Sequence, residues 1–290
     1  MTRCRHVPPQ RAGREVNDLM ARRGMAPPAG PPAELQARRE HLCRLLPERH
    51  LRTLDEAEEF LRDRLMLTVL PGSALPSLFG ACAPPADPEA RGFARYPEDK
   101  WWWDMALAER PGVHRLRIHR GKGLIVDDRL LVMLDPLCSD ELLRAERGDY
   151  GTEAAVLAAH LRTAGPSILE DVKQELGFEP KMLRGVRDRL ERGGALVSRE
   201  VRLPAKGGGH RHTSELSRWD QVYPGGARGD DTGEAGLTGL VVAGVRAAVL
   251  AAETEPRSWF SWPVDAALVE QLVEDGRLIR PAPGWLATPW

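Results

Sequence analysis

Apolar positions near the start of the chain follow the spacing of amphipathic helices. Leucines at near-helical spacing predict a helix within residues 32–50. A second helix is predicted over residues 53–67, where Thr53 is the expected N-cap and Glu56, three residues later, completes a capping box. Residues 1–32 lack this pattern and are rich in Arg, Pro and Gly, so we expect a disordered basic arm there.

The apolar pattern changes in the next part of the chain. After a loop-rich stretch, residues 114–120 alternate like a strand, and a Gly-Lys-Gly turn follows them. Residues 124–134 then predict a further strand or a helix. We therefore expect a mixed α/β region over residues 33–149.

The pattern is sharpest after residue 150. Three amphipathic helices and two strands are predicted, over residues 151–165, 166–177, 181–194, 195–203 and 213–223. We expect Ser167 to cap the second helix and Gly177 to end it. Three helices with a tight turn before the third, followed by a hairpin with a flexible tip, form the pattern of a winged helix-turn-helix domain. The sequence predicts this domain over residues 150–223.

The last part of the chain repeats this order in a shortened form. A helix, a reduced middle helix and a third helix leading into a short hairpin predict a second, abbreviated winged helix over residues 237–290. Residues 224–236 would be the linker. The predicted fold class is therefore α+β, with tandem winged helix-turn-helix domains and a mixed α/β middle region.

Composition restricts the possible classes of protein. The formal net charge is −1, so a polyanion would have to bind a local patch rather than follow a field of the whole molecule. The four cysteines form no Cys-x-x-Cys pair, which argues against a zinc ribbon or a disulfide framework and favours the cytoplasm. No apolar run reaches the ~18 residues that a membrane span needs. Between Arg3 and Arg52, eleven arginines face five acids, which fits either a solvated tail or a nucleic-acid-binding arm.

Basic residues concentrate on the third helix of the winged-helix segment and on the tip of its hairpin. In a helix-turn-helix domain this helix enters the major groove, where basic side chains meet phosphates and base edges. A tip with three glycines and no acid suits close approach to a phosphate backbone. The predicted DNA-binding residues are Lys181, Arg184, Arg187, Arg202, Lys206, His210 and Arg211. Winged helices also occur as protein-interaction or structural modules, and this alternative stays open.

Three consecutive tryptophans, Trp101 to Trp103, precede Asp104. Neither a strand nor a helix lets one core take all three rings, so at least one should lie at a surface, a cleft or an interface. Trp102 or Trp103 could stack on a base and so contact DNA. In the alternative, two rings are buried between domains and one is half-exposed. Asp104 could activate a water as a catalytic carboxylate, or it could cap a helix.

Common catalytic signatures are absent from the sequence. It has no Gly-rich phosphate loop, no His-Glu-x-x-His, no Gly-x-Ser-x-Gly and no clustered metal-ligand spacing. The segment "RGKG" that begins at Arg120 is too short for a nucleotide loop and predicts a basic turn. We therefore expect no cofactor and no metal.

Three segments, "ALPSLFGA" (74–81), "KWWWDMAL" (100–107) and "RGKGLIVDDRLLVML" (120–134), precede the two winged helices. In this order they resemble the AlkZ-related (YcaQ-like) winged-helix proteins, over roughly residues 53–289. The resemblance implies tandem winged helices around a β-rich region, and a DNA glycosylase that excises bulky alkylated bases or unhooks crosslinks without flipping the base. Those enzymes position water with a Gln-x-Gln or Gln-x-Asp motif. None of the five glutamines here has Gln or Asp two residues later, so that mechanism cannot be carried over to named residues.

The sequence thus favours a cytoplasmic bacterial protein that binds double-stranded DNA as a monomer, with a role in DNA repair. Whether it is a glycosylase stays open, because the water-positioning motif is absent. The alternative is a winged-helix transcription regulator whose middle domain senses a ligand through the tryptophans. A third interpretation is a protein-interaction scaffold.

Overall fold

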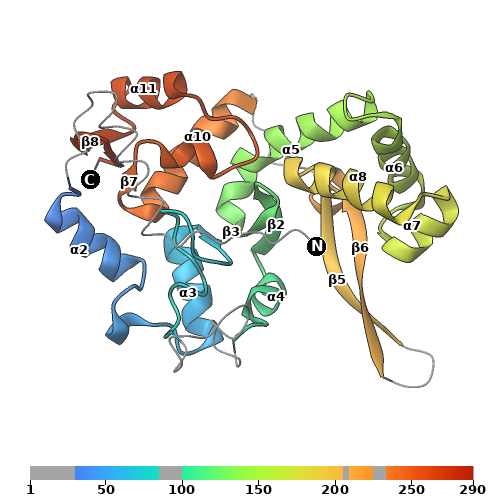
Figure 1. The fold of residues 1–290 in the computed structure, drawn as a ribbon, viewed down its shortest axis with the longest axis horizontal. Coiled ribbons are helices and arrows are strands. Elements are labelled where there is room, and N and C mark those ends of the chain that lie inside the picture. Colours follow the sequence, from blue (N-terminus) through green and yellow to red (C-terminus); the bar gives the residue numbers. More distant parts are fainter. Residues whose placement is uncertain (1–29, 85–99, 205–208, 225–232, 290) are drawn as a thin grey trace, which may run out of the picture.

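The computed structural model describes residues 30–84, 100–204, 209–224 and 233–289 (Figure 1). Nearly all of the predicted basic arm, and Lys206 at the hairpin tip, lie outside these residues. The described chain is a mixed α+β fold with three small antiparallel sheets. Among the described residues, no helix is long and apolar enough to cross a membrane.

The first sheet is preceded by helices. Its part of the chain contains α2 (Ala33–Leu42), the 3-10 helix η1 (Pro47–Arg49), α3 (Leu54–Arg64), β1 (Met66–Thr68), α4 (Trp103–Ala108), β2 (Val113–His119) and β3 (Lys122–Asp127). Strand β3 lies between β1 and β2. Thr53 caps α3 as predicted, because its hydroxyl accepts from the Glu56 N–H at 3.1 Å. The Glu56 carboxylate, however, accepts from the Arg52 N–H rather than from Thr53.

The second sheet follows a long helix. In chain order the elements are η3 (Asp128–Leu130), α5 (Leu131–Glu146), α6 (Thr152–Ala164), β4 (Ser167–Ile168), α7 (Leu169–Leu176), α8 (Pro180–Gly193), β5 (Leu196–Pro204), β6 (His210–Arg218) and α9 (Trp219–Val222). Strand β6 lies between β4 and β5. Strands β5 and β6 form a long hairpin, in which Leu196 pairs with Arg218 and Pro204 with His210.

The third sheet is the smallest. Its elements are α10 (Gly233–Ala248), β7 (Ala251–Ala252), the 3-10 helix η4 (Glu255–Ser258), α11 (Ala266–Glu274), β8 (Ile279–Ala282) and β9 (Trp285–Ala287). Strand β9 lies between β7 and β8.

The same order of elements occurs three times. In each sheet the last strand of the chain segment lies in the middle. A helix precedes each first strand (α3, α6 and α10), and another precedes each second strand (α4, α8 and α11). The region predicted as mixed α/β over residues 33–149 therefore has the same order as the two segments that follow it. In the sequence, the long segment between β1 and α4 makes this repetition difficult to recognise.

The three sheets share one core. Helix α5 packs against α6, α8 and α10. A single buried cluster includes Leu124, Leu216 and Leu286, one from the middle strand of each sheet. In Figure 1, α6, α7, α8 and the β5–β6 hairpin form one side of the molecule, with the first and third sheets on the other side. Helix α8 is thus held between its own sheet and the rest of the fold.

Some predicted boundaries differ from the observed ones. Ser167 lies in β4, where its hydroxyl donates to the Gly165 carbonyl at 2.9 Å, so it does not cap α7. Gly177 follows the last residue of α7 with a left-handed φ of 63°, as predicted.

Two further boundaries lie near the end of the second sheet. The returning strand, predicted to run to residue 223, ends at Arg218, whose buried guanidinium donates to Glu146 of α5 at 2.6 Å. The linker predicted over residues 224–236 is shorter, because α10 begins at Gly233.

Candidate nucleic-acid interface

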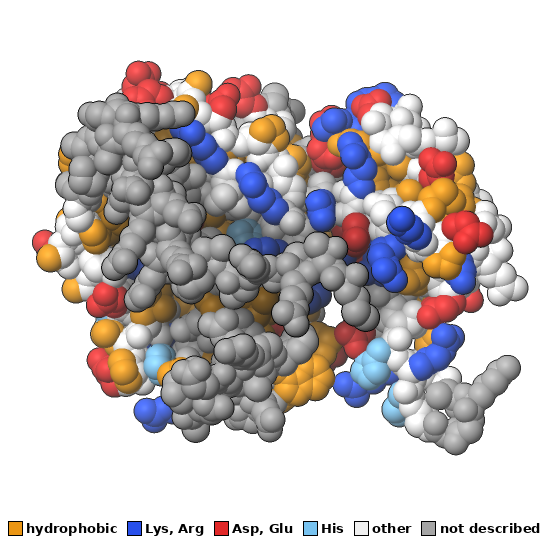
Figure 2. All heavy atoms as spheres, in the orientation of Figure 1, with side chains coloured by type: hydrophobic (Ala, Val, Ile, Leu, Met, Phe, Trp, Pro, Cys, Tyr) orange, Lys and Arg blue, Asp and Glu red, His pale blue; other side chains and the backbone are white. Residues whose placement is uncertain are grey.

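Helix α8 has a buried side and an exposed basic side. Leu183 and Leu190, seven residues apart, are buried in the shared core. Lys181, Arg184 and Arg192 are exposed on the other side, and no residue in the described ranges forms an ion pair with them. Figure 2 shows Lys and Arg side chains gathered over the part of the molecule that carries α8. The predicted DNA-binding residues Lys181 and Arg184 thus lie on an exposed cationic surface.

Gly185 lies on the same exposed side. A Cβ atom at this position would have no neighbour within 4 Å, so packing inside the protein does not require a glycine here. Glycine inside a helix costs roughly 0.5–1 kcal/mol relative to Ala. The missing side chain leaves the helix backbone accessible to another molecule. Below, the α8 surface means Lys181, Arg184 and Gly185.

Arg187 does not belong to the α8 surface, which corrects its prediction as a DNA contact. Its Nε donates to Glu191 at 2.9 Å, and Glu191 is only 2% exposed. Arg117 of β2 donates to the other Glu191 oxygen at 2.6 Å and to Asp188 at 2.9 Å. These bonds hold α8 against β2. Arg187 is therefore part of an internal ion-pair network.

The β5–β6 hairpin carries the other predicted cations. Arg202 and His210 are exposed near its end. Arg211 is also exposed, but its guanidinium lies 3.3 Å from the carboxylate of Glu170 on α7, which balances its charge. Lys206 lies outside the described residues. The hairpin thus adds the exposed side chains of Arg202 and His210, near its end, to the exposed basic side of α8 as predicted DNA contacts.

The three tryptophans near the start of α4 differ in their exposure. Trp103 is 4% exposed and packs in the same buried cluster as Leu107. Trp101 and Trp102 are 58% and 42% exposed. The expectation that at least one ring lies at the surface is confirmed. The prediction that Trp103 stacks on a base is wrong for this conformation, because the ring is enclosed. The alternative prediction, with two buried rings, is also wrong because only one ring is buried.

Asp104 is buried in the first turn of α4 and forms an ion pair. Arg115 of β2 donates from Nε to Asp104 Oδ2 at 2.8 Å. The N-cap of α4 is Trp102, without a side-chain capping bond, so the interpretation of Asp104 as a cap is wrong. Its catalytic role stays a prediction. In the described part of the chain, no group of three His, Cys, Asp or Glu side chains could hold a metal ion.

Sequence reasoning missed two cations at the turn between β2 and β3. Arg120 and Lys122 are exposed on either side of Gly121. A Cβ atom on Gly121 would lie 2.7 Å from the Arg192 Nε, so the end of α8 touches this turn. The segment "RGKG" indicates a basic turn, but no local signal shows that α8 lies beside it.

His119 precedes this turn and is buried. Its Nδ1–H donates to the Trp259 carbonyl. Burial lowers the pKa of His119 below its usual 6.5, and the charges of Lys122 and Arg120 lower it further, against the opposing effect of the bond to Trp259. The imidazole is therefore held in its neutral form.

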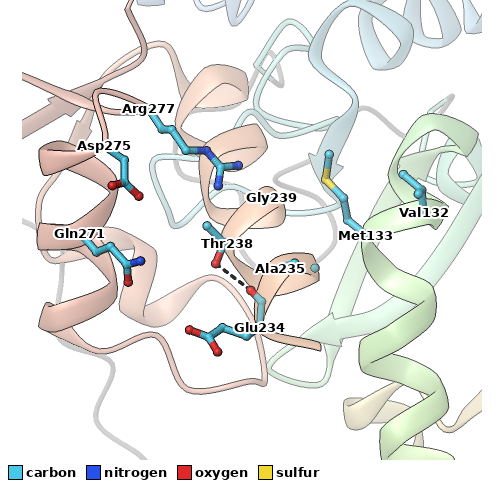
Figure 3. A pocket seen from close by; sticks show the side chains of 10 residues that line it. Val132, Met133, Glu234, Ala235, Thr238, Gly239, Gln271, Asp275 and Arg277 are labelled. Carbon is cyan, nitrogen blue, oxygen red and sulfur yellow. Dashed lines mark hydrogen bonds between the residues drawn. The ribbon is translucent and has the colours of Figure 1, made fainter. Parts of the chain in front are cut away.

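A cavity of about 510 Å³ lies between α5, α10 and α11 (Figure 3). In Figure 3 the side chain of Arg277 extends from the end of α11 toward α10. The lining combines apolar and polar side chains, which include Val132, Met133, Glu234, Gln271, Asp275 and Arg277. None of the residues predicted to bind DNA lines it.

No family model, curated protein or solved structure matches the chain. The function of these surfaces therefore has to be inferred from their own geometry and charge.

Proposed function

We propose that the protein binds double-stranded DNA through the α8 surface and the β5–β6 hairpin. The observation that carries this proposal is the exposed basic side of α8, where Lys181 and Arg184 share one side of the helix with Gly185. Lys and Arg form strong charge-assisted hydrogen bonds with phosphates. A helix without a side chain at the centre of its exposed side allows a duplex to approach closely.

The order of elements supports a winged-helix interpretation. Helices α6, α7 and α8 precede the β5–β6 hairpin, and β4 pairs with β6. In winged helix-turn-helix proteins, the helix in the place of α8 enters the major groove. Because the same order occurs three times, we extend the proposal to tandem winged helices and to a relationship with the AlkZ-related winged-helix proteins.

A role in DNA repair follows from the region around α4. The exposed rings of Trp101 and Trp102 are suited to stack on an unpaired or modified base, a contact typically worth ~1–3 kcal/mol per base. Asp104 is the adjacent carboxylate. Arg115 binds its Oδ2 atom, so Oδ1 is the oxygen that would take a proton from an attacking water.

Salt dependence of duplex binding tests the DNA-binding proposal. Affinity falls as salt rises, and each phosphate contact contributes about 0.9 to the steepness of log affinity against log salt. Lys181→Gln with Arg184→Gln should therefore make this dependence shallower by about 1.8. The control pair is Arg52→Gln with Arg246→Gln, two exposed cations outside α8 and the β5–β6 hairpin, and it should leave the slope unchanged. Equal slopes for all three proteins would contradict the proposal.

Base release from alkylated and crosslinked duplexes tests the repair role. If Asp104 activates water, Asp104→Asn should abolish release while duplex binding stays intact. Absence of base release by the parent protein would leave a DNA-binding protein without glycosylase activity.

A second candidate, a winged-helix transcription regulator, is favoured by the cavity between α5, α10 and α11. Its polar lining, with Glu234, Gln271 and Arg277, suits a small polar ligand, although the sequence had suggested the tryptophans for this role. A dimer that protects palindromic sites in a footprinting experiment would identify a regulator. A monomer that prefers damaged duplex would identify a repair protein.

A further inference from the structure

The turn between β2 and β3 has an unusual backbone conformation for its residues. Arg120 and Gly121 both have positive φ, at 51° and 82°. Positive φ at both central residues is typical of a type I′ hairpin turn, which favours Asn, Asp or Gly at these positions. A bulky residue such as Arg is rare there, and backbone outliers of this kind cluster at functional sites.

Contacts from neighbouring elements fix this turn. Arg120 donates from its guanidinium to the Arg257 carbonyl in η4. Arg117 donates from Nε to the Gly121 carbonyl at 3.1 Å. The turn is therefore hydrogen-bonded both to its own strand β2 and to η4, which belongs to the segment of the third sheet.

Three cations collect at this support. Arg120 and Lys122 are exposed on the turn, and the exposed Arg192 lies against Gly121 from α8. None of the three forms an ion pair within the part of the chain that the structure describes. A guanidinium has five N–H donors, so the bond from Arg120 to Arg257 leaves others for a ligand. Below, the junction cluster means Arg120, Lys122 and Arg192.

The junction cluster continues the basic side of α8. Lys181 and Arg192 are eleven residues apart, which is about 17 Å along a helix that rises 1.5 Å per residue. Two acids lie between them. Asp188 pairs with Arg117 at 2.9 Å, and Glu191 is buried and pairs with Arg117 and Arg187. Phosphates of one DNA strand follow each other at about 3.4 Å along the duplex axis, so this length corresponds to about five of them.

We propose that the junction cluster binds a phosphate of duplex DNA as a second site, separate from Lys181 and Arg184, at the place where the three sheets meet. This inference rests on the proposed function. Arg and Lys side chains without a nearby acid recognise the oxygens of a phosphate through charge and hydrogen bonds. Because such contacts do not read bases, the site adds affinity without sequence preference.

The test compares salt slopes for duplex binding, measured by fluorescence anisotropy. Lys122→Gln with Arg192→Gln should lower the slope by about 1.8, as should Lys181→Gln with Arg184→Gln, and all four changes together should lower it by about 3.6. Arg52→Gln with Arg246→Gln is again the matched control. Thermal melting checks the fold of each variant. Lys122→Gln alone changes one exposed side chain, and it should still make the salt dependence shallower by about 0.9.

Three results would overturn the junction cluster as a duplex contact. An unchanged slope in Lys122→Gln with Arg192→Gln, beside a lower slope in Lys181→Gln with Arg184→Gln, would overturn it and leave the proposed function in place. Absence of salt-dependent duplex binding by the parent would overturn both. Calorimetric binding of pyrophosphate that the Lys122 and Arg192 changes abolish, without an effect on duplex binding, would assign the cluster to a free anion.

Discussion

Arg117 on β2 donates to the carboxylate of Glu191 on α8, with 2.6 Å between Nη1 and Oε2. Arg187 donates to the other oxygen of the same carboxylate. Because Glu191 is almost completely buried, its charge is compensated by these two guanidinium groups rather than by water. This carboxylate, together with the bond from Arg117 to Asp188, therefore holds α8 against the first sheet.

Glu191→Ala should destabilise the protein by about 2–4 kcal/mol in urea unfolding, because it removes the buried carboxylate that Arg117 and Arg187 share and leaves Arg117 paired with Asp188 alone. We expect less than the full cost of breaking a buried ion pair, since both guanidinium groups reach solvent. Replacing Arg117 and Glu191 together by Leu should cost less than the two single changes combined. Strict additivity would contradict a coupling between the two residues.

Gly185→Ala should raise the free energy of unfolding by about 0.5–1 kcal/mol, because Ala is the better helix former and nothing lies near the added Cβ. Gly185→Gln should keep the fold but lower duplex affinity, since its longer side chain would separate α8 from the DNA. Val156→Gln, at an exposed position of α6, controls for the added amide. Unaltered affinity in Gly185→Gln would show that no duplex approaches this side of α8.

Alanine substitutions of Trp103 and Trp102 should have different effects on stability and on binding. Trp103→Ala should cost ~3–5 kcal/mol, as expected for a large buried side chain, and it would affect binding through unfolding. Trp102→Ala should cost little stability but weaken binding to duplex that contains an unpaired or adducted base. Urea unfolding and binding curves on both variants measure this. Equal losses of stability in the two variants would contradict the observed burial.

Acid should destabilise the protein through His119. Its pKa is below 6.5 in the folded protein because of burial and the nearby charges of Lys122 and Arg120, whereas the unfolded chain has the usual value. The unfolded state therefore binds the proton more readily, so unfolding becomes easier as the pH falls through about 6.5. His119→Gln should reduce this dependence between pH 7 and 5.5. The exposed His210→Gln is the control, and an identical pH dependence in both variants would refute the assignment.

Local signals in the sequence predict the helices and strands of the second sheet. The apolar stripe of α8 and the left-handed glycines Gly177 and Gly194 act within a few residues, so the pattern contains what is needed to place α8. Helix α5 is different, because Pro136 would predict from the sequence that the helix ends or kinks there. Packing of α5 against α6, α8 and α10 outweighs this local cost.

The candidate interface was predictable only in part. Lys181 and Arg184 follow from the helical pattern alone. Arg187 was assigned wrongly because the second partner of Glu191, Arg117, is 74 residues away from it in the sequence. The junction cluster was missed for the same reason, since Arg192 comes close to Gly121, the neighbour of Lys122, only in the folded chain. Spacing along the sequence indicates which side of a helix or strand a residue occupies, but not which residues from distant segments contact that side in the folded chain.

The order of helices and strands is repeated three times, but the charge on the surface of the repeats is not. Helices α4, α8 and α11 occupy the same place in their segments, yet they display different chemistry. Exposed Trp102 adjoins α4, cations cover α8, and the charged residues of α11 are the acids Glu270 and Glu274. The acid Glu270 is moreover paired with Arg280, so α11 offers no basic surface like that of α8. The three segments thus share an order of elements, and only the second of these helices carries an exposed basic side.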